Sequence, residues 1–144
     1  MSLANIKPYF RTRLNALGFT KEHPEAFDVE EVPSTLIDRT FHILNGPATF
    51  VSNNQNHLVM TVDVGLQMFF KGFRSEEDGR LAAEVALEDI LKECLTAENR
   101  VTQASTGIKD VKLSTAEIIR MDESQDNISL LQMAFVVEYT LDFE

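Results

Sequence analysis

The three histidines and the single cysteine are the residues of this chain best suited to metal binding or nucleophilic chemistry. His23, His42 and His57 do not form an H-x-x-x-H or H-E-x-x-H spacing, which would place two of them together on one face of a helix. His23 and His57 fall in predicted loops, and His42 falls in a predicted strand. Cys94 falls on the apolar side of a predicted helix, where a thiol usually packs as a small apolar group. These four residues predict neither a metal site nor a nucleophile.

The six glycines do not belong to a phosphate-binding or hydrolase motif. None of them forms G-x-G-x-x-G, a P-loop or a G-x-S-x-G nucleophile elbow. Carboxylates are abundant, so a catalytic pair stays open, but abundance without a motif is poor evidence for acid–base chemistry. A single cysteine also excludes an internal disulfide framework. We therefore predict no catalytic residues, no cofactor and no metal ligands.

Charge is the most unusual property of the composition. The chain carries 23 acidic and 13 basic side chains, a formal net charge of −10. This balance disfavours binding to nucleic acid through a basic patch and docking to anionic lipid. The acids are concentrated in residues 21–40 and 121–144. Such asymmetry is typical of a surface that meets a charged partner, and the alternative is a solvated face that aids solubility.

The length of 144 residues and an apolar content of 44% predict one domain, residues 1–144, with a core that needs no disulfides. No segment approaches the roughly 20 apolar residues of a membrane span. The first twenty residues also lack the apolar run of a signal peptide. We therefore expect an intracellular protein without a membrane partner.

The first half of the chain predicts one helix and the start of a sheet. Residues 5–17 repeat apolar side chains at spacings of a helical stripe, and Gly18 is suited to end that helix. The acidic, proline-containing segment 19–36 is expected to be an irregular connection. Residues 38–45 predict a short strand that Gly46-Pro47 stops, so residues 46–57 are expected to form an exposed loop.

Three further strands are predicted from alternation. Residues 58–71 place one apolar set on one face over nearly their whole length. Residues 128–143 alternate in the same way, and residues 111–121 alternate more weakly. The polar segment 122–127 between the last two strands is expected to be a turn.

The second helix has the clearest signals. Ser75 is a candidate N-cap and Asp78 completes a capping box. Apolar residues then recur at helical spacing from Ala83 to Leu95, which predicts a helix of about twenty residues. The element order is α-β-β-α-β-β, and it predicts an α+β fold, a two-layer sandwich with a mainly antiparallel sheet packed by helices.

Strand length suggests how the protein assembles. A strand of thirteen residues reaches roughly 43 Å, whereas a helix of twenty residues spans about 30 Å. The strands are therefore expected to overhang their helices. An overhanging ribbon exposes edges and apolar faces unless a neighbour covers them, which favours an oligomer.

Four sequence segments, in this order, carry a resemblance to a known family. They are IKPYFRTRL at 6–14 with Gly18-Phe19 after it, IDRTFHI at 37–43, FKGF at 70–73 before the acidic helix start, and YTLDF at 139–143. In these patterns of fold and order the chain resembles the tail terminator proteins of long-tailed bacteriophages, also called neck or tail-completion proteins. The resemblance covers nearly the whole chain and includes no active-site motif.

The resemblance implies a structural virion protein, not an enzyme, assembled in the host cytoplasm and located in the tail or neck. Proteins of this family form a homo-hexameric ring that caps the last ring of tail tube protein. The ring then offers a surface to the head-tail connector or stopper protein. Double-stranded DNA passes through its channel without specific binding, and no cofactor is implied.

The polar loops are candidates for axial docking in such a ring. The residues assigned to these contacts are Asn53, Asn54, Gln55, Asn56, His57, Asp122, Glu123 and Asp126. Glu22, Glu30 and Glu31 are candidates for an acidic channel lining, which would repel DNA phosphates and let the duplex slide. Two alternatives remain: a head-side connector adaptor or stopper of the neck, and a small α+β ligand-binding regulatory oligomer, which needs an enclosed pocket.

Overall fold

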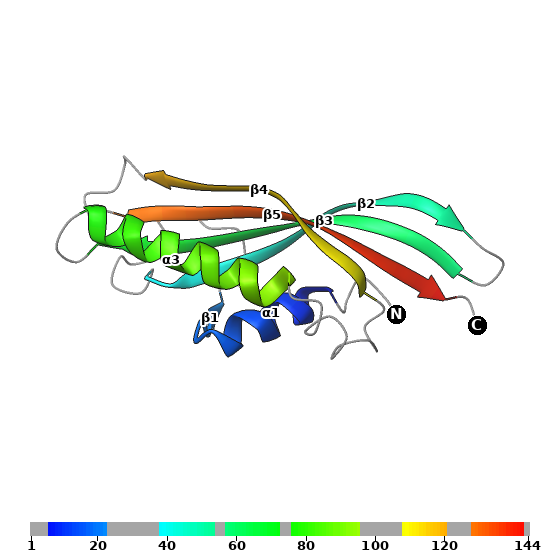
Figure 1. The fold of residues 1–144 in the computed structure, drawn as a ribbon, viewed down its shortest axis with the longest axis horizontal. Helices are drawn as coiled ribbons and strands as arrows, with labels where there is room; N and C mark the ends of the chain where they lie inside the picture. The colour runs from blue at the N-terminus through cyan, green and yellow to red at the C-terminus, as the bar shows by residue number, and fades with distance from the viewer. Residues whose placement is uncertain are drawn as a thin grey trace.

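The computed structural model describes residues 6–22, 38–53, 57–72, 76–95, 108–120 and 128–142. Within these residues the chain has an α+β fold, with two helices and a five-stranded mixed sheet that contains most of the described residues (Figure 1). The elements are α1 (Ile6–Ala16), β1 (Lys21–Glu22), β2 (Thr40–Asn53), β3 (His57–Lys71), α3 (Glu76–Leu95), β4 (Ile108–Arg120) and β5 (Ile128–Asp142). The predicted α+β class is confirmed.

The sheet is built around one long central pair. Its strand order is β1-β2-β3-β5-β4, and each pair of adjacent long strands is antiparallel. β3 and β5 pair without interruption, from His57 opposite Asp142 to Lys71 opposite Ile128. The outer strands β2 and β4 each contain two register shifts. The central ladder is therefore regular, and the irregularity lies in its two flanks.

The predicted stop at Gly46-Pro47 is wrong, because β2 continues through it to Asn53. The two residues form a bulge, in which the register passes from Asn45 opposite Val64 directly to Ala48 opposite Val62. Proline is tolerated in an edge strand or a bulge, where its missing N–H removes no ladder hydrogen bond. A Cβ on Gly46 would lie 3.1 Å from the backbone oxygen of Asp63, so the close approach favours glycine. The bulge bends β2 without ending it.

The connection predicted as irregular contains a short strand. Lys21 and Glu22 form β1, which runs parallel to the start of β2 and pairs with Thr40 and Phe41. The predicted order therefore lacks one element, and the sheet is mixed because of it. Two residues are too short to show a period, so alternation could not have indicated this strand.

Both helices lie on the same side of the sheet (Figure 1). α3 packs on β3, β5 and β4, and α1 packs on α3 and β2. The helix-facing side chains of the strands alternate as predicted, and those of β5 from Leu131 to Tyr139 are all buried. The core also includes Ile6, Phe10, Leu14, Ala83, Ala86, Ile90, Cys94, Val62, Val64, Leu66, Met68 and Phe70. The predicted apolar stripes of both helices are confirmed.

The strands extend well beyond the helices, as strand length predicts. In Figure 1 one end of β2, β3 and β5 projects past α3 and α1 as a ribbon. The apolar alternation continues into this overhang, but burial there is incomplete. Met60 is only half-buried and Phe50, opposite it on β2, is 57% exposed, whereas Tyr139 on the other side of Met60 is buried. Apolar side chains in the overhang are therefore left to solvent by the described part of a single chain.

Substitution of one phenylalanine in the core and one in the overhang tests which side chains stabilise the folded monomer. Phe135 is fully buried and its ring lies 5.1 Å from that of Phe10. We expect Phe135→Ala to lower the free energy of unfolding by about 3–5 kcal/mol. Phe50→Ala, the matched control, should change it by less than about 0.5 kcal/mol while the chain is monomeric. Urea denaturation at low protein concentration measures both, and equal losses would contradict the assigned core.

Candidate interaction surfaces

The residues proposed for docking and channel lining fall mostly outside the part of the chain that the structure describes. Asn54, Gln55, Asn56, Glu30, Glu31, Asp122, Glu123 and Asp126 lie outside it. Asn53 ends β2 and His57 begins β3, so the predicted loop from 46 to 57 is mostly strand. Glu22 lies in β1, where its carboxylate accepts a hydrogen bond of 2.9 Å from Arg11 Nε. That ion pair offsets the negative charge which channel lining would need.

Two of the candidate chemical groups are buried, and a third, His23, lies outside the described residues. His42 lies in β2 and is 5% exposed, and Cys94 is completely buried on the core side of α3, as predicted. The backbone oxygen of Cys94 accepts a 2.8 Å hydrogen bond from the Tyr9 hydroxyl, which ties α1 to α3. Burial raises the pKa of the Cys94 thiol to about 12, and the neighbouring Glu93 adds to the shift. Among the described residues, no group of three or more His, Cys, Asp or Glu gathers as metal ligands would.

The outer edge of β2 is a long uncharged surface. β1 pairs only with Thr40 and Phe41, and no other described strand lies along the rest of β2. From position 42 to 53 the sequence HILNGPATFVSN contains no Asp, Glu, Lys or Arg. Three of its apolar side chains are more than half exposed, namely Leu44, Phe50 and Val51. Natural edge strands are usually protected by charges, so this edge is suited to pairing with another strand.

The opposite edge of the sheet is β4. Its inner side pairs with β5 along its whole length, and no described strand lies on its outer side. Lys112 and Glu117 are exposed and give this edge charges of both signs. The sheet thus ends in two long edges of different chemistry, one uncharged and one charged.

The bulges of the two edges lie at neighbouring levels of the sheet. In β2 the register shifts between Asn45 and Ala48, opposite β3 residues 62–64. In β4 it shifts between Leu113 and Thr115, opposite Phe135 and Ala134, which in turn pair with Val64 and Gly65. The second shifts of the two strands lie on either side of the row in which Met60 pairs with Tyr139. Because bulges increase local twist, both flanks bend at two pairs of neighbouring levels.

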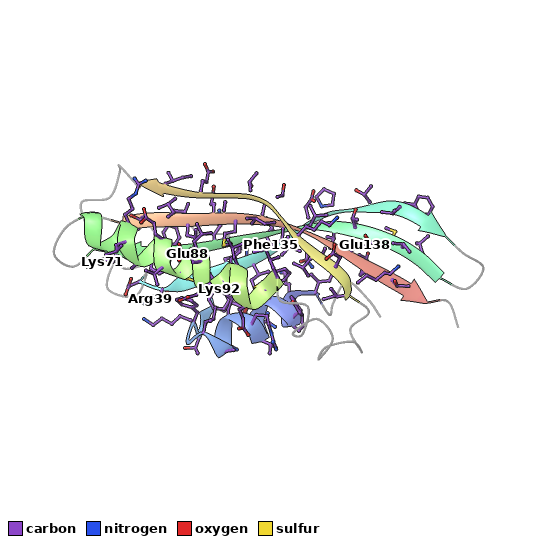
Figure 2. All side chains as sticks on the ribbon, viewed as in Figure 1. Arg39, Lys71, Glu88, Lys92, Phe135 and Glu138 are labelled. Atoms are coloured by element: carbon purple, nitrogen blue, oxygen red, sulfur yellow. The ribbon has the colours of Figure 1, made fainter. Side chains whose placement is uncertain are left out.

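A groove beside α3 contains a strained arginine that the sequence did not indicate. Leu17, Phe19, Arg39, Leu81, Ala82, Val85, Ala86 and Asp89 line this open groove of about 400 Å³. The Arg39 guanidinium lies 5.9 Å from the ring centre of Phe19 and 5.5 Å from that of Phe70. Arg39 has a φ of 60°, and Figure 2 places it below the sheet beside α3. A positive φ can be expected from sequence at glycine, and to a lesser degree at asparagine, aspartate or histidine, but not at arginine.

The sheet face opposite the helices has a shallow trough. Leu44, Gly65, Ala134 and Thr115 are paired in one row across the four long strands. The two small residues in the middle of this row leave a depression of about 180 Å³ that Leu44 and Thr115 flank. No described helix covers this face (Figure 1).

Comparison with known proteins identifies no relative. No protein-family model matches the chain. No curated protein matches it significantly. None of the helices in the described ranges has the length and apolar character needed to cross a membrane.

Burial of Cys94 predicts a specific pH dependence of stability. The thiol ionises near pH 9 in the unfolded chain, but its folded pKa is about 12, so the unfolded state releases a proton first. The contribution of this thiol to the free energy of unfolding is therefore fully present below pH 9, and it is lost as the pH rises toward 12. We expect the wild-type free energy of unfolding to fall faster than that of Cys94→Ala, approaching about 1.4 kcal/mol per pH unit. Parallel pH profiles in urea denaturation would contradict this expectation.

The left-handed backbone at Arg39 predicts an unusual order of two variants. Arg39→Ala and Arg39→Gly both remove the guanidinium from Phe19 and Phe70, so their difference reports the backbone alone. Because a Cβ is strained at a φ of 60°, we expect the glycine variant to be more stable by about 1 kcal/mol. Thermal or urea unfolding measures the difference. The reverse order, which is normal elsewhere in a chain, would exclude strain at this position.

Proposed function

We propose that this chain is a tail terminator of a long-tailed bacteriophage. In this proposal, six copies form a ring that caps the tail tube and stops its polymerisation. The far surface of the ring joins the tail to the head-tail connector or stopper protein, and DNA passes through the ring during ejection. The proposal includes the two-layer arrangement of sheet and helices predicted from the order of the elements. It rests on the family resemblance of the sequence together with the following features of the fold.

The overhang is the observation that carries the proposal. β3 and β5 have 15 residues each, or roughly 50 Å, whereas the 20 residues of α3 span about 30 Å. The part of the ribbon beyond the helices keeps apolar side chains but has no described cover. Exposed apolar surface of this kind usually marks a protein interface. A subunit of a ring uses such a surface, because each copy must contact two neighbours through different faces.

The acidic excess suits the same role. Six copies of a chain with net charge −10 surround DNA with negative charge, which disfavours adhesion of the phosphates. The acids at Glu30, Glu31, Asp122, Glu123 and Asp126 remain candidates for the channel wall. Glu22 is the weakest of these candidates, because Arg11 pairs with its carboxylate.

Two other functions are distinguishable from this one. A connector adaptor or stopper would share the ring but bind the head side alone. A ligand-binding regulatory oligomer is favoured only by the groove at Arg39, where a guanidinium held by two aromatic rings meets apolar walls. That groove is open along its length, whereas small-molecule sites usually enclose their ligand.

The ring and its position form one prediction. Light scattering of the purified chain alone should give about six times the 16.3 kDa monomer mass, or six copies should be found at the neck of tail particles. Electron microscopy of the chain mixed with isolated tail tubes should show one ring at one end of each tube, and phage lacking the gene should make overlong or unjoined tails beside filled heads.

Each alternative gives a different result in that experiment. A ring that binds only the head connector would identify an adaptor or stopper. A chain that stays monomeric both alone and on tubes would exclude the ring. Tails of normal length that are joined to heads without the protein would exclude the terminator function.

A further inference from the structure

We infer that neighbouring copies join through their sheet edges, with β2 of one copy pairing antiparallel with β4 of the next. The surface on β2 runs from Leu44 to Asn53, and the surface on β4 runs from Val111 to Arg120. The inference deepens the proposed ring and rests on it, since it names the strands that would form the subunit contact. The occupant of each edge is a second copy of this chain.

Strand direction favours this contact. β2, β3, β5 and β4 alternate in direction across the sheet, so β2 and β4 run in opposite senses. When a second copy is placed beside the first in the same orientation, its β2 lies antiparallel to the first copy's β4. The antiparallel ladder then continues across the boundary without a change of pattern. Each copy uses both edges, so the contact is heterologous and repeats around a closed ring.

The matched bulges remove the main obstacle to such a contact. A bulge on one edge normally twists that edge away from any straight strand beside it. Here the two edges bend at neighbouring levels, because the shifts at 45–48 in β2 and 113–115 in β4 both adjoin the row in which Val64 pairs with Phe135. Two edges with such bends can follow each other, whereas an unrelated strand would separate at each bulge. The curvature of one subunit therefore continues into the next.

Charge is compatible with the same arrangement. Positions 42–53 carry no ionised side chain, so Lys112 and Glu117 of the next copy meet no like charge across the boundary. An unbroken ten-residue antiparallel pair supplies about ten backbone hydrogen bonds, and the bulges and Pro47 reduce that number here, within the range of about 5–15 found in specific interfaces. A dimer that paired β2 with β2 would leave the β4 edge of both copies open. The pairing of β2 with β4 leaves no long edge exposed in a ring.

Cysteine crosslinking tests the pairing directly. Thr49 on β2 lies on the face of the sheet opposite the helices, as do Lys112, Thr115 and Glu117 on β4, judged by their registers with β3 and β5. Thr49→Cys is combined in turn with Lys112→Cys, Thr115→Cys or Glu117→Cys in the full-length chain.

Buried Cys94 is retained, and the wild-type chain controls for its reaction. Thr49→Cys with Glu84→Cys, on an exposed position of α3, is the matched control.

Mild oxidation should convert at least one of the three double variants into a ladder of covalent multimers ending at six copies. The single variants and the Glu84 control should stay monomeric on a non-reducing gel. A mixture of Thr49→Cys with the matching single β4 variant should give covalent dimers only. Circular dichroism and the urea midpoint of each variant check that it folds as the wild-type chain does.

Three results would overturn the inference, and they have different consequences. Covalent dimers of Thr49→Cys alone would mean that β2 pairs with β2. Hexamers by light scattering without crosslinking of any of the three double variants would mean that the ring exists but uses other surfaces. A folded chain that stays monomeric alone and with tail tubes would remove the ring itself, and with it the proposed function.

Discussion

The uninterrupted pairing of β3 with β5 is the interaction on which the rest of the structure depends. It aligns the alternation of two strands that are far apart in sequence, so that residues such as Val64 and Phe135 face the helices together. A slip of one residue would move the apolar set of one strand to the opposite face from that of its partner. Because this central ladder is regular, the flanking strands β2 and β4 can carry bulges without loss of register in the core.

The length of that ladder sets the relation between stability and assembly. α3 and α1 cover one end of the helix-facing side, and there the inward side chains of β5 from Leu131 to Val137 are buried. Beyond the helices the same ladder continues with Phe50 exposed and Met60 half-buried (Figure 1). One end of the ribbon therefore supplies the buried apolar contacts that stabilise the monomer, and the other end is available for contacts between molecules.

Sequence patterns predicted the elements that are long and periodic. The stripe of α1, the apolar side of α3 and the alternation of β3 and β5 follow from repeated spacing, and all are confirmed. β1 and the bulge at Gly46-Pro47 were missed because the first is too short for a period and the second depends on close approach to Asp63. The surfaces were predicted least well. Polar composition pointed to loops, whereas the register places Leu44 and Phe50 on an open edge, and register is set by pairing between distant segments.

The β2 edge combines two properties that usually occur separately. Pro47 and the bulges are features that protect an edge from indiscriminate pairing, because they interrupt the ladder that an unrelated strand would need. Its uncharged side chains and exposed Phe50 are features of an edge that pairs. Together they select a partner by shape, since only a strand with bends near the same levels can follow this one. Within the described chain β4 bends at neighbouring levels, so in the inferred pairing a second copy would follow this edge more closely than a straight strand would.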